Sequence, residues 1–167
     1  THGFFFPDPE KKRGDNFLSS QENNYVLAED PLIRSGLILA GANHAWQGNA
    51  QAEGHEDGIL TAYEIAQQDL SNTKLVVLSA CETGLGDIKG SEGVYGLQRA
   101  FKMAGVDKII MSLWQVNDKA TKDFMVQFYT NWLEKSMSIH DAFYSTQKEM
   151  QEKYGEPYFW AGFVLME

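Results

Sequence analysis

The single cysteine of the chain, Cys81, is suited by type and position to nucleophilic chemistry. It follows the segment 74–80, in which polar and apolar residues do not alternate, a pattern typical of a strand covered on both faces. A loop with glycines at 84, 86 and 90 comes next, before a helical pattern. Backbone N–H groups in such a turn lower the pKa of a thiol and solvate its thiolate. The alternative is an inert thiol, because free cysteines are among the most buried residue types.

A cysteine peptidase also needs a histidine that takes the thiol proton and returns it to the leaving amine. His2 precedes a glycine, which lets the next backbone N–H approach a ligand closely. His44 follows another buried-strand pattern, whereas His55 lies in an acidic loop and His140 stands at a helix start, where we expect exposure. From the residues alone, His2 and His44 are equal candidates, each with the alternative of a hydrogen-bonded structural histidine.

The elements that must position these residues alternate between strand and helix patterns. Thr61 and Glu64 predict a capping box at one helix start, and Gly105 predicts the end of another. Strands are expected at 35–41, 74–80, 108–114 and 159–166, helices at 61–70, 94–104, 118–133 and 138–154, and loops at 1–23, 43–58 and 82–92. This order predicts an α/β fold with a largely parallel sheet and helices on both faces. Catalytic groups in such folds gather beyond the carboxyl ends of the strands, where Cys81 and the segment after Trp114 lie.

Composition narrows the class of protein. The 167 residues suit a single domain spanning 1–167, and 43% hydrophobic with 22% charged residues is typical of a globular protein. The net charge is −9 and the 14 basic residues are scattered, so we expect no direct nucleic-acid partner. The apolar runs are too short to cross a bilayer, which predicts a soluble protein. A lone cysteine forms no internal disulfide and indicates a reducing compartment such as the cytoplasm.

The sequence gives weaker support to two other kinds of site, a nucleotide-binding loop and a zinc site. The segment 84–90 resembles a nucleotide-binding loop but is one residue too long for the dinucleotide fingerprint, carries Asp87 where phosphate would approach, and lacks a P-loop ending. A zinc site built from His44, His55, Glu56 and Asp57 lacks both the cysteines and the His-x-x-x-His spacing of such sites. We therefore expect neither a metal nor another cofactor.

Five motifs together resemble the CHAT family, a branch of the caspase and separase class of cysteine endopeptidases. They occur in the order of that family, at residues 1–5, 57–65, 78–84, 112–118 and 159–163. The resemblance implies a caspase-like three-layer sandwich and, in the whole protein, upstream tetratricopeptide repeats. Catalytic histidines of this class follow an apolar strand, so we expect the chain to lack one or more N-terminal strands and to hold His2 loosely.

The resemblance also assigns roles. The His-Gly pair makes His2 the acid/base, and the cysteine after Ser-Ala makes Cys81 the nucleophile, with no third residue required. The implied reaction is cleavage of a protein or peptide through a thioester, with the backbone N–H groups of Gly3 and Cys81 holding the oxyanion. The alternative is a catalytically silent interaction module with the same motifs.

Trp114 and Asp118 stand four residues apart just past a predicted strand end. Their arrangement resembles separase, which implies that Asp118 binds a P1 Arg or Lys and that Trp114 forms a wall of the pocket. The alternative is that Asp118 caps the following helix and pairs with Lys122.

Overall fold

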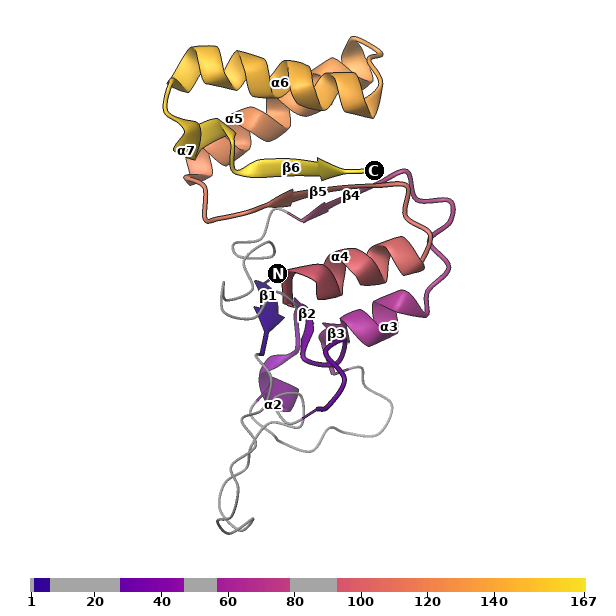
Figure 1. Cartoon of the computed structure of the whole chain (residues 1–167). Helices are drawn as coiled ribbons and strands as arrows, with labels where there is room; N and C mark the ends of the chain where they lie inside the picture. The colour runs from indigo at the N-terminus through magenta and orange to yellow at the C-terminus, as the bar shows by residue number, and fades with distance from the viewer. Residues whose placement is uncertain (1, 7–27, 47–56, 79–92) are drawn as a thin grey trace. The chain divides into compact units, whose positions relative to one another are not determined.

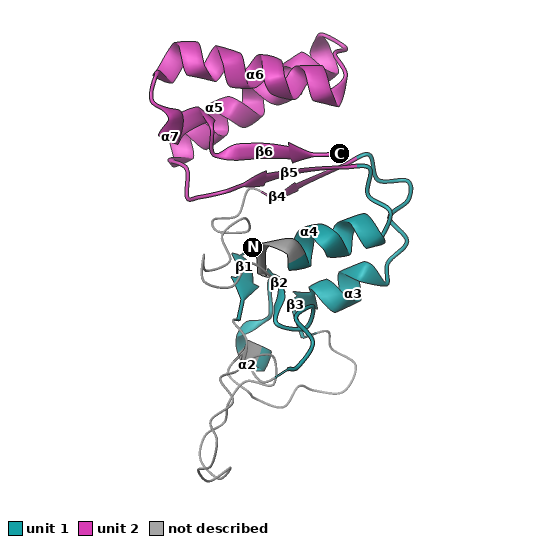
Figure 2. Cartoon of the chain, in the orientation of Figure 1, with its two compact units in different colours: residues 1–74, 85–107 teal, residues 75–84, 108–167 magenta. Residues whose placement is uncertain are grey.

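The computed structural model describes residues 2–6, 28–46, 57–78 and 93–167 (Figure 1). The chain divides into two compact units, each containing a small sheet and helices (Figure 2). Unit 1 comprises residues 1–74 and 85–107, and unit 2 comprises residues 75–84 and 108–167. The predicted α/β class is therefore confirmed at the level of a mixed α/β fold.

Unit 1 contains an antiparallel sheet in the order β1-β2-β3, made of β1 (His2–Phe5), β2 (Ser35–Ile38) and β3 (Ile59–Thr61). The predicted strand after residue 35 is confirmed, and Leu37 lies opposite Gly3 on one side and Leu60 on the other. The sequence predicted loops at β1 and gave no strand at β3. Both strands are short and lack alternation, so only pairing with β2 stabilises them.

Three helices complete unit 1: α2 (Asn43–Trp46), α3 (Ala62–Ala66) and α4 (Gly93–Met103). The predicted capping box of α3 is confirmed, since Glu64 N–H donates to Thr61 Oγ1 at 3.2 Å and Thr61 N–H donates to Glu64 Oε2 at 2.8 Å. Helix α3 is shorter than predicted. Helix α2 lies in a segment that was predicted to be a loop.

Four apolar residues of the helix predicted at 94–104 are buried, namely Leu97, Ala100, Phe101 and Ala104. The helix ends as predicted at Gly105, whose φ of +95° is a left-handed conformation that favours glycine. The Val106 N–H donates to the Phe101 carbonyl at 3.0 Å, which is the 6→1 bond of a Schellman motif.

Unit 2 contains a second sheet in the order β4-β5-β6, made of β4 (Leu75–Leu78), β5 (Lys108–Ser112) and β6 (Phe163–Met166). Strands β4 and β5 are parallel, whereas β6 runs antiparallel to β5. A largely parallel arrangement is thus wrong for the described strands, because β4–β5 is their only parallel pair. A single helix between strands returns the chain in the parallel sense, but the connection from β5 to β6 contains two long helices and a short one.

The two long helices are α5 (Asp118–Tyr129), extended by the π-helical turn η1 (Thr130–Glu134), and α6 (Ile139–Tyr154). They lie on the same side of the sheet (Figure 1). They bury an apolar core with the strands beneath them, formed by Ile110, Val116, Ala120, Phe124, Phe128, Ile139, Ala142, Phe143, Met150 and Phe163. The Phe124 ring stacks on the Phe163 ring with centroids 4.5 Å apart, which joins α5 to β6.

A short helix, α7 (Pro157–Trp160), precedes β6 where the sequence predicted the strand to have begun. Aromatic residues at 158–160 favour a strand by propensity. Pro157 reverses that preference because its fixed φ suits the first helical position. Within the described ranges, no helix is long and apolar enough to cross a bilayer.

Candidate functional site

His2 is the first residue of β1, and its side chain is exposed. The sequence predicted a loop here, but the histidine begins a strand at the edge of the described three-stranded sheet. An exposed imidazole at a sheet edge is accessible to a substrate from solvent, which general acid/base chemistry requires.

Gly3 follows on the same strand and presents its backbone N–H on the side away from β2. The Phe6 N–H donates to the Arg34 carbonyl at 2.8 Å, which makes this pair a hydrogen-bonded one. Hydrogen-bonded and non-hydrogen-bonded pairs alternate along an antiparallel ladder, so Gly3 and Leu37, opposite each other, form a non-hydrogen-bonded pair. The Gly3 N–H is therefore oriented to bind a group beyond the edge of this sheet.

Cys81 lies in the segment 79–92, outside the described residues. The strand that precedes it in sequence, β4, is described. The apolar pattern predicted this strand, and it pairs in parallel with β5. His44 lies in α2, but its side chain is outside the described atoms, and His55 falls in the segment 47–56, also outside them.

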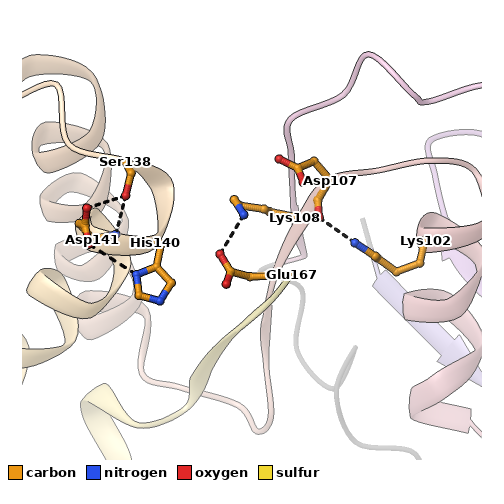
Figure 3. A network of polar contacts seen from close by, with 7 residues as sticks. All are labelled: Lys102, Asp107, Lys108, Ser138, His140, Asp141 and Glu167. Carbon is orange, nitrogen blue, oxygen red and sulfur yellow. Dashed lines mark hydrogen bonds and ion pairs between the residues drawn. The ribbon is translucent and has the colours of Figure 1, made fainter.

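His140 is exposed in the first turn of α6, as predicted. Its Nδ1 lies 3.5 Å from Asp141 Oδ1, and the Ser138 Oγ accepts a hydrogen bond from the Asp141 N–H at 3.0 Å (Figure 3). The Ser138 hydroxyl also donates to the Asp141 carboxylate; this bond, followed by that of His140, lowers the pKa of Asp141. The cluster caps a helix, which explains His140 without catalysis.

The remaining contacts drawn in Figure 3 are one ion pair in unit 2 and one lysine-to-carbonyl hydrogen bond in unit 1. Lys108 Nζ lies 2.8 Å from Glu167 Oε1, joining the start of β5 to the residue after β6. In unit 1, Lys102 Nζ donates to the Asp107 carbonyl at 2.7 Å, just beyond the end of α4. A lysine near exposed carbonyls at a helix C-terminus stabilises that end.

Asp118 is the first residue of α5 and is exposed. The alternative role of helix cap belongs to its neighbour, because Asn117 Oδ1 accepts hydrogen bonds from the N–H groups of Lys119 at 3.0 Å and Ala120 at 3.4 Å. Among the described residues, no ion pair joins Asp118 to Lys122. The Asp118 carboxylate thus has neither of the structural roles that the sequence offered for it.

Trp114 is half-buried against the core of unit 2. Its indole Nε1 donates to the Tyr158 carbonyl at 3.1 Å, and the Tyr158 hydroxyl donates to the Gln115 carbonyl at 2.6 Å. Sequence reasoning missed Tyr158. The only signal for it was its place beside the aromatic motif at 159–163, to which the residues alone gave no role.

No cluster of three or more histidine, cysteine or acidic side chains suitable for a metal occurs in the described part of the chain. Of the rival zinc set, His55 and Glu56 fall outside that part, and so does the side chain of His44. The described residues of the predicted site offer an imidazole at His2, a backbone N–H at Gly3 and a carboxylate at Asp118.

The mixed α/β chain carries a histidine-glycine pair on an edge strand of one sheet and a Trp/Asp pair after a parallel strand of the other. The CHAT domain family model matches residues 1–167, and the chain belongs to this family. The resemblance inferred from the motifs is therefore confirmed.

Two curated relatives carry the same name in different species. The chain is 35% identical over 111 residues to Tetratricopeptide repeat protein 28 of Mus musculus and 33% identical over 111 residues to that of Homo sapiens. In each case the match covers 65% of this chain and 4% of the relative. The chain thus spans only a small part of these proteins.

Proposed function

We propose that this domain is a cysteine endopeptidase that cleaves protein substrates with a dyad of Cys81 and His2. The observation that carries the proposal is the family match over the whole chain, with the His-Gly pair standing at an exposed strand edge. Cys81 follows the strand β4, so its assignment depends on motif and position. Caspase-like peptidases use this pair of residue types for acyl transfer.

The proposed reaction has two steps. The Cys81 thiolate attacks the carbonyl carbon of the scissile peptide, and the intermediate collapses to a thioester as the C–N bond breaks and the His2 imidazolium gives its proton to the departing amine. Water then attacks the thioester, gives a proton to His2 and releases the acid, while the thiolate is restored.

The orientation of Gly3 supports its role in the oxyanion hole. Its N–H is directed away from β2, so it is available to an oxyanion without loss of a β1–β2 ladder bond. The backbone N–H of Cys81 is the second donor in this proposal. Removal of one such donor typically costs about 100-fold or more in turnover.

The exposed Asp118 and the half-buried Trp114 are proposed to bind the P1 side chain. A carboxylate that neither caps its own helix nor pairs with Lys122 is available to a guanidinium or ammonium group from the substrate. The indole provides a flat face on which the same cation can stack. The proposed substrate therefore carries Arg or Lys at P1.

We propose further that residues 1–167 form a caspase-like domain with a three-layer sandwich, since the family match covers all of them. The relatives are named for tetratricopeptide repeats, which supports regulation by such repeats in the whole protein. A single cysteine supports a reducing compartment such as the cytoplasm.

The test uses the complete protein and a set of peptide substrates and electrophiles with Arg, Lys, Leu or Met at P1. Cys81→Ala should abolish cleavage and labelling with folding unchanged, and His2→Ala should lower turnover by about 100-fold, the loss expected for a general acid/base. His44→Ala is the matched control and should retain most activity.

Three results would contradict this proposal. Full activity of Cys81→Ala would show that Cys81 is not the nucleophile. A loss of activity confined to His44→Ala would assign the acid/base role to His44 in place of His2. An unlabelled, inactive parent protein would instead support a silent interaction module.

A further inference from the structure

Trp114, Gln115 and Tyr158 form a set of crossed hydrogen bonds that we name the clasp. The Trp114 side chain donates to the backbone of Tyr158, and the Tyr158 side chain donates to the backbone of Gln115. Each segment therefore holds the other through one side chain and one carbonyl. At 2.6 Å, the tyrosine bond is as short as a strong O–H···O bond.

Close backbone contact reinforces the clasp. The Leu113 N–H donates to the Gly162 carbonyl at 2.7 Å, which extends the β5–β6 pairing toward α7. A Cβ added at Gly162 would lie 2.5 Å from Val116 Cγ2 and 3.1 Å from Trp114 Nε1. The side chains of Val116 and Trp114 therefore pack directly against the Gly162 backbone, where a Cβ would force them to shift.

Helix α7 also contacts the end of α6. The Phe159 ring stacks on the Tyr154 ring with centroids 5.4 Å apart, and Trp160 Nε1 donates to the Gly155 carbonyl at 3.2 Å. These contacts tie α7 to the end of α6. The clasp thus connects the loop between β5 and α5 to a supported element.

Packing of the apolar core does not explain why residue 158 is a tyrosine with a hydroxyl group. The side chain of Tyr158 is 48% exposed, so its ring contributes little to the buried core of unit 2. A phenylalanine would keep the edge-to-face contact with Phe159 and lose only the bond to Gln115. The bond therefore acts on the conformation of the loop that begins with Trp114 and leads to Asp118.

We propose that Tyr158 is a positioning residue that holds Trp114 and Asp118 in the arrangement needed to bind a basic P1 side chain. This inference rests on the proposed peptidase function and names a residue that supports its specificity. Tyr158 acts through the loop and does not contact the reacting atoms. Small displacements of a bidentate carboxylate or a stacking ring weaken recognition of a cation more than they alter chemistry elsewhere.

The experiment compares Tyr158→Phe with Tyr144→Phe in the complete protein. Tyr144 is a matched control, since it is 50% exposed in α6 of the same unit and its aromatic contacts with His140 and Phe143 survive the change. In Tyr158→Phe, KM for a P1 arginine peptide should rise about fivefold, the ratio for one typical hydrogen bond, with kcat unchanged. KM for the matched P1 leucine peptide should stay at the parent value.

Hydrogen exchange supplies a readout independent of activity. The amides of residues 113–117 should exchange several-fold faster in Tyr158→Phe and at the parent rate in Tyr144→Phe. Unchanged exchange in Tyr158→Phe would overturn the clasp. Faster exchange with equal effects on both peptides, or with no effect, would overturn the role in specificity. A parent that cleaves no peptide would refute the proposed function, while the exchange rates would still decide whether the clasp orders the loop.

Discussion

Replacing Asn131 by alanine tests whether a buried polar network holds α5 and η1 to α6. Asn131 is fully buried and lies in the π-helical turn. Its Nδ2 donates to Thr146 Oγ1 at 3.1 Å and to Glu149 Oε1 at 3.3 Å. Its Oδ1 accepts from Lys135 Nζ at 2.8 Å and from Gln127 Nε2 at 3.3 Å. All four hydrogen-bonding positions of the amide are thus occupied.

The expected loss of stability follows from the burial of the partners. The side chains of Lys135, Gln127 and Glu149 reach water, so each regains a hydrogen bond and contributes little to the cost. Thr146 is fully buried and would be left without its donor, at a cost of about 1–3 kcal/mol. The cavity left by the amide adds on the order of 1 kcal/mol. The free energy of unfolding should therefore fall by about 2–4 kcal/mol.

Urea unfolding measures this change. With a slope of about 2 kcal/mol/M, the midpoint of Asn131→Ala should fall by about 1–2 M while the slope stays constant. Glu134→Ala, an exposed change in the same turn, is the control and should lie within about 0.5 kcal/mol of the parent. A double-mutant cycle with Thr146→Val should give a coupling of about 1 kcal/mol. A midpoint equal to that of the control, or no coupling, would refute the reasoning.

Two further changes test the charged groups of α5. Asp118→Asn should lower kcat/KM for P1 arginine peptides by about tenfold or less, because the carboxylate is exposed, and should leave matched P1 leucine peptides unchanged; equal losses would contradict the pocket. The hydrogen bonds of Lys153 and then Tyr154 lower the pKa of Asp123 below its ordinary 3.8, so its contribution to stability is present above that pH and is lost as pH falls through the lowered pKa. Urea midpoints of the parent and of Asp123→Asn should differ near pH 7 and converge in acid, and a constant difference would contradict this assignment.

Local sequence patterns predicted much of the fold. The apolar runs predicted strands at β4 and β5. In β5, Ile109, Ile110 and Met111 are fully buried as predicted, whereas in β4 only Leu78 is buried. The capping box at α3 and the glycine after α4 were also predicted, because each depends on hydrogen bonds between residues a few positions apart.

The errors arose where distant segments decide the local structure. Strand β1 forms because it pairs with β2 about 30 residues later in the chain, and no local periodicity signals that pairing. Capping of α5 by Asp118 was left as an alternative, and only the structure assigns the cap to Asn117, since both residues are good caps by type. The antiparallel direction of β6 depends on the connection from β5, which runs through α5 and α6 before it reaches β6.

The sequence by itself determined the family and the residue types at His2, Cys81 and Asp118, because these are properties of motif and spacing. The tertiary structure decided in which direction the Gly3 N–H of β1 points. It also gave the role of capping α5 to Asn117 and not to Asp118. It also brought Tyr158 to Gln115, 43 positions apart in sequence. Ladder register and side-chain-to-backbone bonds between distant segments exist only after the chain has folded, so no local pattern encodes them.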